Sequence, residues 1–192
     1  MKKTLLIIGL TIFTFTSINA QKKTTFGVKA GINLASISSE IDLDPSSKTA
    51  MYFGALAEYS ISSKFSIQSE ILYTRHNMTA YHAVYGGPFP RMEFTLDFIQ
   101  IPVLAKFHIN ENISLELGPS YNILLNDKVV VLNNNNSSET DFAKKTEFSG
   151  ILGATYKFKN GFFTSVRYYK GFSKTMFNNK INSFQIGVGY MF

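Results

Sequence analysis

The sequence predicts an all-β fold, an eight-stranded antiparallel up-and-down transmembrane β-barrel, and three observations support this prediction. Eight segments alternate apolar and polar residues with a period of two. The connections between these segments are short and long in turn. The chain ends in an alternating segment whose last residue, Phe192, is aromatic. Membrane barrels combine an apolar outer face, a polar lumen, short periplasmic turns and long external loops.

The first 20 residues predict a secretory signal peptide. Lys2 and Lys3 precede an apolar run over residues 5–15, and a short polar stretch closes on Ala20. The apolar run is too short to cross a bilayer, and a small residue stands at the expected cleavage site. We therefore expect residues 1–20 to be removed and residues 21–192 to form one outer-membrane β-barrel domain. The expected location is the outer membrane of a Gram-negative bacterium.

The first four expected strands cover residues 26–34, 51–61, 65–73 and 94–109. Each has one apolar face, which would contact lipid, and an opposite face that carries charged or amide residues. In chain order these polar residues are Lys29 and Asn33, then Glu58, then Gln68 and Glu70, then Gln100 and Lys106. This alternation favours strands because successive side chains of a strand point to opposite faces of the sheet.

The last four expected strands cover residues 113–123, 148–158, 162–172 and 184–192. The first three carry Ser114 and Glu116, Ser149 and Lys157, and Arg167 on their polar faces. On the last strand, the apolar face is formed by Phe184, Ile186, Val188, Tyr190 and Phe192, and we expect the barrel-insertion machinery to recognise this pattern. Two prolines, Pro102 and Pro119, lie inside strands. Because proline removes a ladder donor, we expect a β-bulge at each.

The connections support the same topology. Residues 62–64, 110–112 and 159–161 form short turns, whereas residues 36–49, 77–91, 126–145 and 173–180 form long loops. This alternation matches the periplasmic turns and external loops of membrane barrels. The alternative is a soluble lipocalin-like barrel, whose apolar face would line a ligand cavity. The charged residues on the opposite face favour the membrane barrel, because they suit a polar lumen.

Seven charged residues share the polar face, six at nearly the same height and Lys157 slightly nearer the periplasmic end, and we expect them to form a lumen charge cluster. They are Lys29, Glu58, Glu70, Lys106, Glu116, Lys157 and Arg167. Three acids and four bases suit mutual neutralisation better than selection of one ion sign, which an ion-selective constriction or a proton relay would need. Because eight strands leave an interior about wide enough for side chains alone, we predict a salt-bridged plug.

The sequence also predicts partners within this cluster. Lys106 and Glu116 are equidistant from the middle of the second short turn, so they should face each other across that hairpin. Glu58 and Glu70 bracket the first short turn, and two neighbouring carboxylates need cations nearby. The planar guanidinium of Arg167 can bridge two acids.

Composition excludes several function classes. The chain has no cysteine, 15% aromatic residues and 17% charged residues. Disulfides, thiol chemistry and a lipid anchor on cysteine are therefore excluded. Removing Lys2 and Lys3 lowers the 19 basic residues to 17 against 13 acidic ones, a net charge of +4. This excess suits the phosphates of lipopolysaccharide, but it is too small and too scattered for nucleic acid.

The three histidines, His76, His82 and His108, suggest no specific chemistry. Ser36 or Ser173 could in principle join His76 and Asp97 in a hydrolase, but no local motif fixes that geometry. His76 and His82 lack a third metal ligand at a defined spacing. We therefore predict that the chain is not an enzyme and has no catalytic, cofactor-binding or metal-binding residues.

Four motifs across the mature chain resemble a known family. They are GALAEY at residues 54–59, QSEILY at 68–73, FIQIPVLAK at 98–106 and VRYYKG at 166–171. In this order they are similar to the PorT-like outer-membrane β-barrel family. The resemblance implies an eight-stranded barrel with an outer membrane protein beta-barrel domain. It implies little about activity, because the best-known member is tied to a secretion system and most others have no assigned role.

The leading functional hypothesis is a non-enzymatic structural or interaction scaffold with a plugged lumen. Its loops or periplasmic rim would bind an unidentified protein partner, within a secretion or envelope complex. The alternative is a narrow channel or carrier for a small solute. The other expected partners are outer-membrane lipid, lipopolysaccharide and the barrel-insertion machinery, and nucleic acid is not expected.

Overall fold

The computed structural model describes residues 24–38, 46–81, 91–131, 136–139, 145–173 and 180–192. This part of the chain forms β-strands joined by turns, and none of it is a helix long and apolar enough to cross a membrane. The expected signal peptide, residues 1–20, lies outside the described residues, as does His82.

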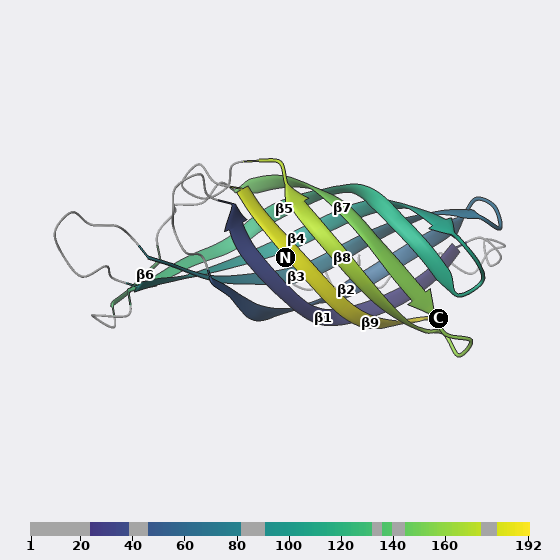
Figure 1. The fold of residues 1–192 in the computed structure, drawn as a ribbon, viewed down its shortest axis with the longest axis horizontal. Helices are drawn as coiled ribbons and strands as arrows, with labels where there is room; N and C mark the ends of the chain where they lie inside the picture. The colour runs from purple at the N-terminus through teal and green to yellow at the C-terminus, as the bar shows by residue number, and fades with distance from the viewer. Residues whose placement is uncertain (1–23, 39–45, 82–90, 132–135, 140–144, 174–179) are drawn as a thin grey trace, which may run out of the picture.

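The described strands form one closed antiparallel sheet. They are β1 (Thr24–Ser38), β2 (Ser46–Ser60), β3 (Phe65–Tyr81), β4 (Arg91–His108), β5 (Ile113–Val131), β6 (Asn136–Glu139), β7 (Thr146–Lys157), β8 (Phe162–Gly171) and β9 (Lys180–Met191). All except β6 belong to the barrel wall, in which chain neighbours pair and β1 also pairs with β9. The predicted eight-stranded antiparallel up-and-down barrel is confirmed (Figure 1).

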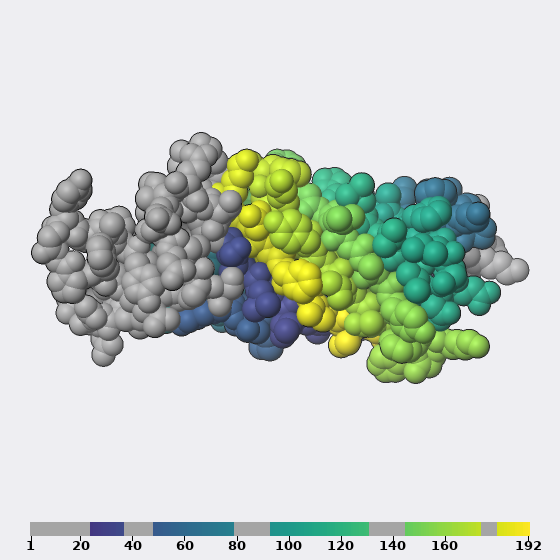
Figure 2. Space-filling view, in the orientation of Figure 1, coloured from purple at the N-terminus to yellow at the C-terminus, as the bar shows by residue number. Residues whose placement is uncertain are grey.

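The wall is apolar on its outside. Side chains with more than half of their surface exposed include Met51, Ile71, Leu117, Leu152 and Val188. Figure 2 shows one side of this wall, where the surfaces of β7, β8 and β9 lie beside one another. Such an exterior suits the hydrocarbon core of a membrane, which covers the outer band of these barrels. A soluble barrel would instead bury these residues inside, so the lipocalin-like alternative does not describe this chain.

Aromatic rings pair on the outer face near both ends of the barrel. Near the short turns, the rings of Phe65 and Phe107 lie 5.1 Å apart, and those of Phe162 and Tyr190 lie 5.0 Å apart. Toward the opposite end, the rings of Tyr121 and Phe148 lie 4.9 Å apart. Rings at these two heights match the aromatic girdles that membrane barrels place at the headgroups.

The short connections lie at the end of the barrel that also carries the C-terminus (Figure 1). They span residues 61–64, 109–112 and 158–161, and by the general rule for these barrels this end faces the periplasm. In the third turn, Gly161 has φ of 88°. A Cβ there would lie 2.9 Å from the carbonyl oxygen of Met191, so glycine is required both by conformation and by space.

At the external end, the strands are longer than the sequence pattern predicts. β3 extends to Tyr81, β4 begins at Arg91, and β5 continues to Val131. Part of the range 126–145, expected to be a loop, forms the end of β5 and its partner β6. Alternation of apolar and polar side chains marks the part of a strand that contacts lipid. Beyond the membrane, two strands can stay paired by backbone hydrogen bonds alone, without this alternation. The predicted boundaries were therefore too short at this end.

The expected bulges at Pro102 and Pro119 are wrong. Both prolines remain in register with their partner strands. A missing donor removes one ladder hydrogen bond but does not require an inserted residue. Register shifts occur instead toward the external end, after Lys48 in β2 and next to Phe98 in β4.

Candidate functional site

The centre of the lumen is occupied by one guanidinium held between two carboxylates. Arg167 of β8 donates from Nη1 and Nη2 to the two oxygens of Glu70 on β3, each at 2.7 Å. Its Nε and Nη2 donate to the two oxygens of Glu116 on β5. All three side chains are about 99% buried. We call this group the Arg167 clamp. Each carboxylate accepts two hydrogen bonds from the guanidinium, and such bidentate pairs are among the strongest hydrogen-bonded contacts in proteins.

A glycine makes the clamp possible. Gly153 of β7 lies in register between Glu116 of β5 and Arg167 of β8. A Cβ at Gly153 would lie 2.8 Å from Arg167 Cγ and 2.9 Å from Glu116 Oε1. The arginine can therefore cross β7 along the lumen wall to reach Glu116. The sequence contains a signal for this contact, since a glycine stands on the charged face of this strand, but it does not identify which partners need the space.

A second ion pair lies nearer the periplasmic end. Lys106 Nζ of β4 donates to Glu58 Oε2 of β2 at 2.8 Å and to Gln68 Oε1 of β3 at 2.9 Å. Ser66 Oγ donates to the other oxygen of Glu58 at 2.9 Å. Gln68 also donates from Nε2 to Glu70. Gln68 thus joins this pair to the Arg167 clamp, and Thr155 Oγ1 of β7 donates to Glu116 Oε2 at 3.2 Å. Together these residues form one charged network across six strands.

The structure brings six of the seven expected cluster residues together. Lys29 is buried, with Nζ 3.7 Å from Glu70 Oε2 and 5.4 Å from the centre of the Tyr52 ring. Lys157, at the periplasmic end of β7, is exposed and lies outside the network. Its strand position places it below the level at which the lumen is filled.

Two of the expected pairings are corrected. Lys106 and Glu116 are opposite each other in the ladder, yet their charged groups bind Glu58 and Arg167 respectively. Glu58 lies opposite Gln68, not Glu70. A long side chain in a tilted sheet reaches a residue on the strand beyond its neighbour, so register alone does not assign ion pairs.

We expect Lys106 to be energetically coupled to Glu58 and not to Glu116. Lys106→Met leaves a carboxylate without its cation, whereas combining it with Glu58→Gln removes both charges. The combined variant should lose less stability than the sum of the single losses, by about 0.5–3 kcal/mol. The same cycle with Glu116→Gln should be closer to additive. Urea unfolding in lipid vesicles measures both cycles, and stronger coupling to Glu116 would contradict the observed pairing.

Above the charged network, toward the external end, the lumen is filled by apolar side chains. This external apolar layer consists of Ala35, Met78, Phe94, Leu96, Phe98 and Ile181, with Leu124 and Val129 packed against it. The alternation of the sequence did not predict this layer. The signal was available in Leu96 and Phe98, which alternate with the polar residues Thr95 and Asp97 on β4, but beyond Phe98 the apolar residues of the same strand change to the opposite face. Neither face could then be identified as the inner one.

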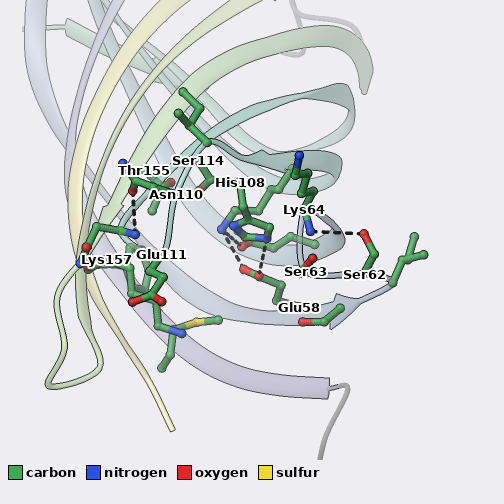
Figure 3. Close-up of a pocket in the computed structure, with 18 residues that line it drawn as sticks. Glu58, Ser62, Ser63, Lys64, His108, Asn110, Glu111, Ser114, Thr155 and Lys157 are labelled. Carbon is green, nitrogen blue, oxygen red and sulfur yellow. Dashed lines mark hydrogen bonds and ion pairs between the residues drawn. The ribbon is translucent and has the colours of Figure 1, made fainter.

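Below the charged network, the lumen opens into a polar cavity of about 770 Å³, which we call the periplasmic vestibule. Its walls include the turns at residues 61–64 and 109–112, and its floor includes Glu58, Lys106 and Gln68. Ser114 and Thr155 are buried in its side, and His108 Nε2 lies 2.9 Å from Ser66 Oγ. Figure 3 shows the labelled side chains around this opening.

The family model described as outer membrane protein beta-barrel domain matches residues 19–176. The chain belongs to this family. Like other members of the outer membrane β-barrel family, it is a protein of the Gram-negative outer membrane. No curated protein sequence matches the chain.

Solved structures show the same fold at low sequence identity. The attachment invasion locus protein Ail of Yersinia pestis is 16% identical, with a TM-score of 0.55 over 88% of this chain and 99% of that chain. Neisserial surface protein A is 19% identical, with a TM-score of 0.58 over 87% of this chain and 97% of that chain. Both are similar to this member of the outer membrane β-barrel family in architecture.

The hydrolase residues considered in the sequence do not assemble in this family member. His76 is buried, its ring lies 5.3 Å from that of Phe98, and neither ring nitrogen has a hydrogen-bond partner among the described residues. The carboxylate of Asp97 accepts from Arg75, and the hydroxyl of Ser173 accepts from the backbone N–H of Phe148. No group of three potential metal ligands occurs in the described part of the chain.

The C-terminal strand closes the outer membrane β-barrel. Phe184, Ile186, Val188 and Tyr190 of β9 point outward, and Phe192 is 74% exposed. β9 pairs with β1 from Gly27 to Ser38, and the Phe192 N–H donates to the Phe26 carbonyl at 2.8 Å. The recognition of this strand by insertion machinery remains a prediction.

Deleting Phe192 should reduce the amount of barrel in the outer membrane. The deletion removes the terminal aromatic of the expected assembly pattern and the last hydrogen bond to β1. Quantification of the outer-membrane fraction against the parent checks this, with Phe172→Leu as an exposed aromatic control away from the C-terminus. Normal abundance of the truncated protein would show that Phe192 is not needed for assembly.

Proposed function

We propose that this outer-membrane barrel is a non-enzymatic scaffold with a plugged lumen, which binds a protein partner through its loops or periplasmic rim. Its place would be in a secretion or envelope complex. The Arg167 clamp carries this proposal, because it fills the middle of the lumen with buried, mutually neutralised side chains. An eight-stranded barrel has little interior space beyond what such side chains occupy.

The external apolar layer supports the same proposal. It lies between the charged network and the external loops, where a hydrated ion would have to pass Met78, Leu96 and Phe98. Hydrophobic constrictions oppose ion passage by excluding water. A solute crossing the barrel would therefore have to displace both the charged network and the external apolar layer.

Single-channel recording in planar bilayers tests the plug. The refolded parent should show no stable conductance steps. Replacing Glu70, Glu116 and Arg167 together by alanine should produce conductance steps if the side chains of the external apolar layer also move aside. Adding Phe98→Ala to this variant should make the conductance steps larger. Stable unitary steps from the parent protein would contradict the scaffold and support a channel.

The second candidate is a narrow channel or carrier for a small solute. The periplasmic vestibule favours it, because a polar cavity leads from the periplasm to the level of Lys106. The buried hydroxyl of Ser183 and the buried side-chain oxygen of Gln185 have no hydrogen-bond partner among the described residues, as expected where water enters a lumen. The same bilayer recordings distinguish the two candidates.

Membership of the PorT-like group is part of the proposal. The four motifs from residues 54–59 to residues 166–171 support it, and each of them supplies a clamp or network residue. The proposal also includes contacts with lipopolysaccharide and with the barrel-insertion machinery. Photo-crosslinking from the periplasmic turns and external loops in intact cells would identify the protein partner.

A further inference from the structure

The periplasmic vestibule has the dimensions of a binding site. Its volume of about 770 Å³ lies within the range of roughly 300–1,000 Å³ that is usual for ligand pockets. Two walls come from turns whose backbones are held by their own side chains, such as Asn110, which accepts from the Asn112 and Ile113 N–H groups. The shape is therefore fixed by the barrel and its turns.

The charges inside the vestibule are not all neutralised. Lys106 and Glu58 form an ion pair at the floor. The side chains of Lys64, Lys157 and Glu111 line the cavity and form no ion pair with the described residues. Figure 3 shows Lys64 and Lys157 on opposite sides of the opening. Two unpaired cations against one unpaired anion make the vestibule attractive to negatively charged groups.

The remaining lining favours a polypeptide. Hydroxyl and amide side chains are the most frequent kinds in the lining, and Ser114 is one of those buried in its wall. Such groups can pair with peptide N–H and carbonyl groups. Phe163, the one aromatic side chain in the described lining, is 5% exposed. A sugar ring would therefore find no exposed aromatic face on which to stack.

We propose that the periplasmic vestibule binds an acidic peptide segment of a periplasmic protein. Carboxylates of the segment would pair with Lys64 and Lys157 near the opening, and its backbone would contact the hydroxyl and amide groups deeper inside. This proposal rests on the proposed scaffold function. It adds that the partner at the periplasmic rim carries an acidic segment.

Fluorescence anisotropy with a rhodamine-labelled hexaglutamate peptide tests the assignment. The full chain, refolded in zwitterionic detergent, should bind hexaglutamate more tightly than hexalysine. Reversing both cations, with Lys64→Glu and Lys157→Glu, should raise the dissociation constant about tenfold or more. The matched control is Lys170→Glu with Lys180→Glu, which reverses two exposed cations toward the external end and should leave binding unchanged.

Folding of each variant is checked by the different gel mobility of unboiled and boiled samples. Equal loss of binding in both double variants would show a general charge effect and overturn the assignment. Failure of the parent to prefer hexaglutamate, or preference for neutral maltohexaose, would overturn it too. Conductance steps from a parent that still binds hexaglutamate would overturn the plugged scaffold and leave the vestibule assignment standing.

Discussion

Arg167→Met is expected to lower the free energy of unfolding by about 3–5 kcal/mol, because it leaves two buried carboxylates without their cation. Arg167 makes four hydrogen bonds to Glu70 and Glu116, and all three residues are almost fully buried. Lys29 is 3.7 Å from Glu70 and can replace only part of the lost interaction. Urea unfolding of the refolded barrel in lipid vesicles measures the loss.

The control for this prediction removes all three charges of the clamp. Adding Glu70→Gln and Glu116→Gln to Arg167→Met should recover part of the loss, since no uncompensated carboxylate remains there and only the buried Lys29 loses its anion. Lys170→Met, an exposed change on the same strand, should have little effect. If the triple variant is as unstable as the sum of the single variants, the clamp is not a coupled unit.

Leu117→Arg is expected to destabilise the barrel by about 2–4 kcal/mol, as a cation on the lipid face near the midplane does in other membrane barrels. Leu117 is 63% exposed on the outside of β5, between Ala105 of β4 and Leu152 of β7. A guanidinium at this position must either enter the hydrocarbon or bend away toward the headgroups. Unfolding in vesicles gives the value directly.

Leu117→Phe is the matched control, because it keeps the position apolar and should change stability little. An equally large loss for phenylalanine would indicate a packing defect instead of a lipid contact. No loss for arginine would mean that this face does not meet the membrane core.

The barrel wall could be predicted from the sequence because one rule, alternation with a period of two, governs every strand that crosses the membrane. The same rule placed Lys29, Glu58, Glu70, Lys106, Glu116 and Arg167 on the inner face. It also placed Lys106 opposite Glu116, because a short turn fixes the register of its hairpin.

The partners of these charges could not be predicted in the same way. Arg167 and Glu70 are 97 residues apart, and they meet because the sheet closes on itself. Lys106 reaches over β3 to Glu58, a contact that depends on the tilt of the strands. The external apolar layer was missed because the apolar residues of β4 change faces at Phe98. Long-range closure and strand tilt are properties of the folded barrel, and a pattern within one segment does not contain them.

The charged network leaves the closing seam of the barrel free. Its hydrogen bonds join side chains of β2, β3, β4, β5, β7 and β8, whereas β1 contributes the longer Lys29–Glu70 contact. β1 and β9 are held to each other by their backbone ladder. A sheet that is still unzipped along β1 and β9 contains every strand of the network. Because the Arg167 clamp joins β8 to β3 across the lumen, it holds the sheet rolled up from inside. Separating β1 from β9 at this seam would by itself break none of the network's hydrogen bonds.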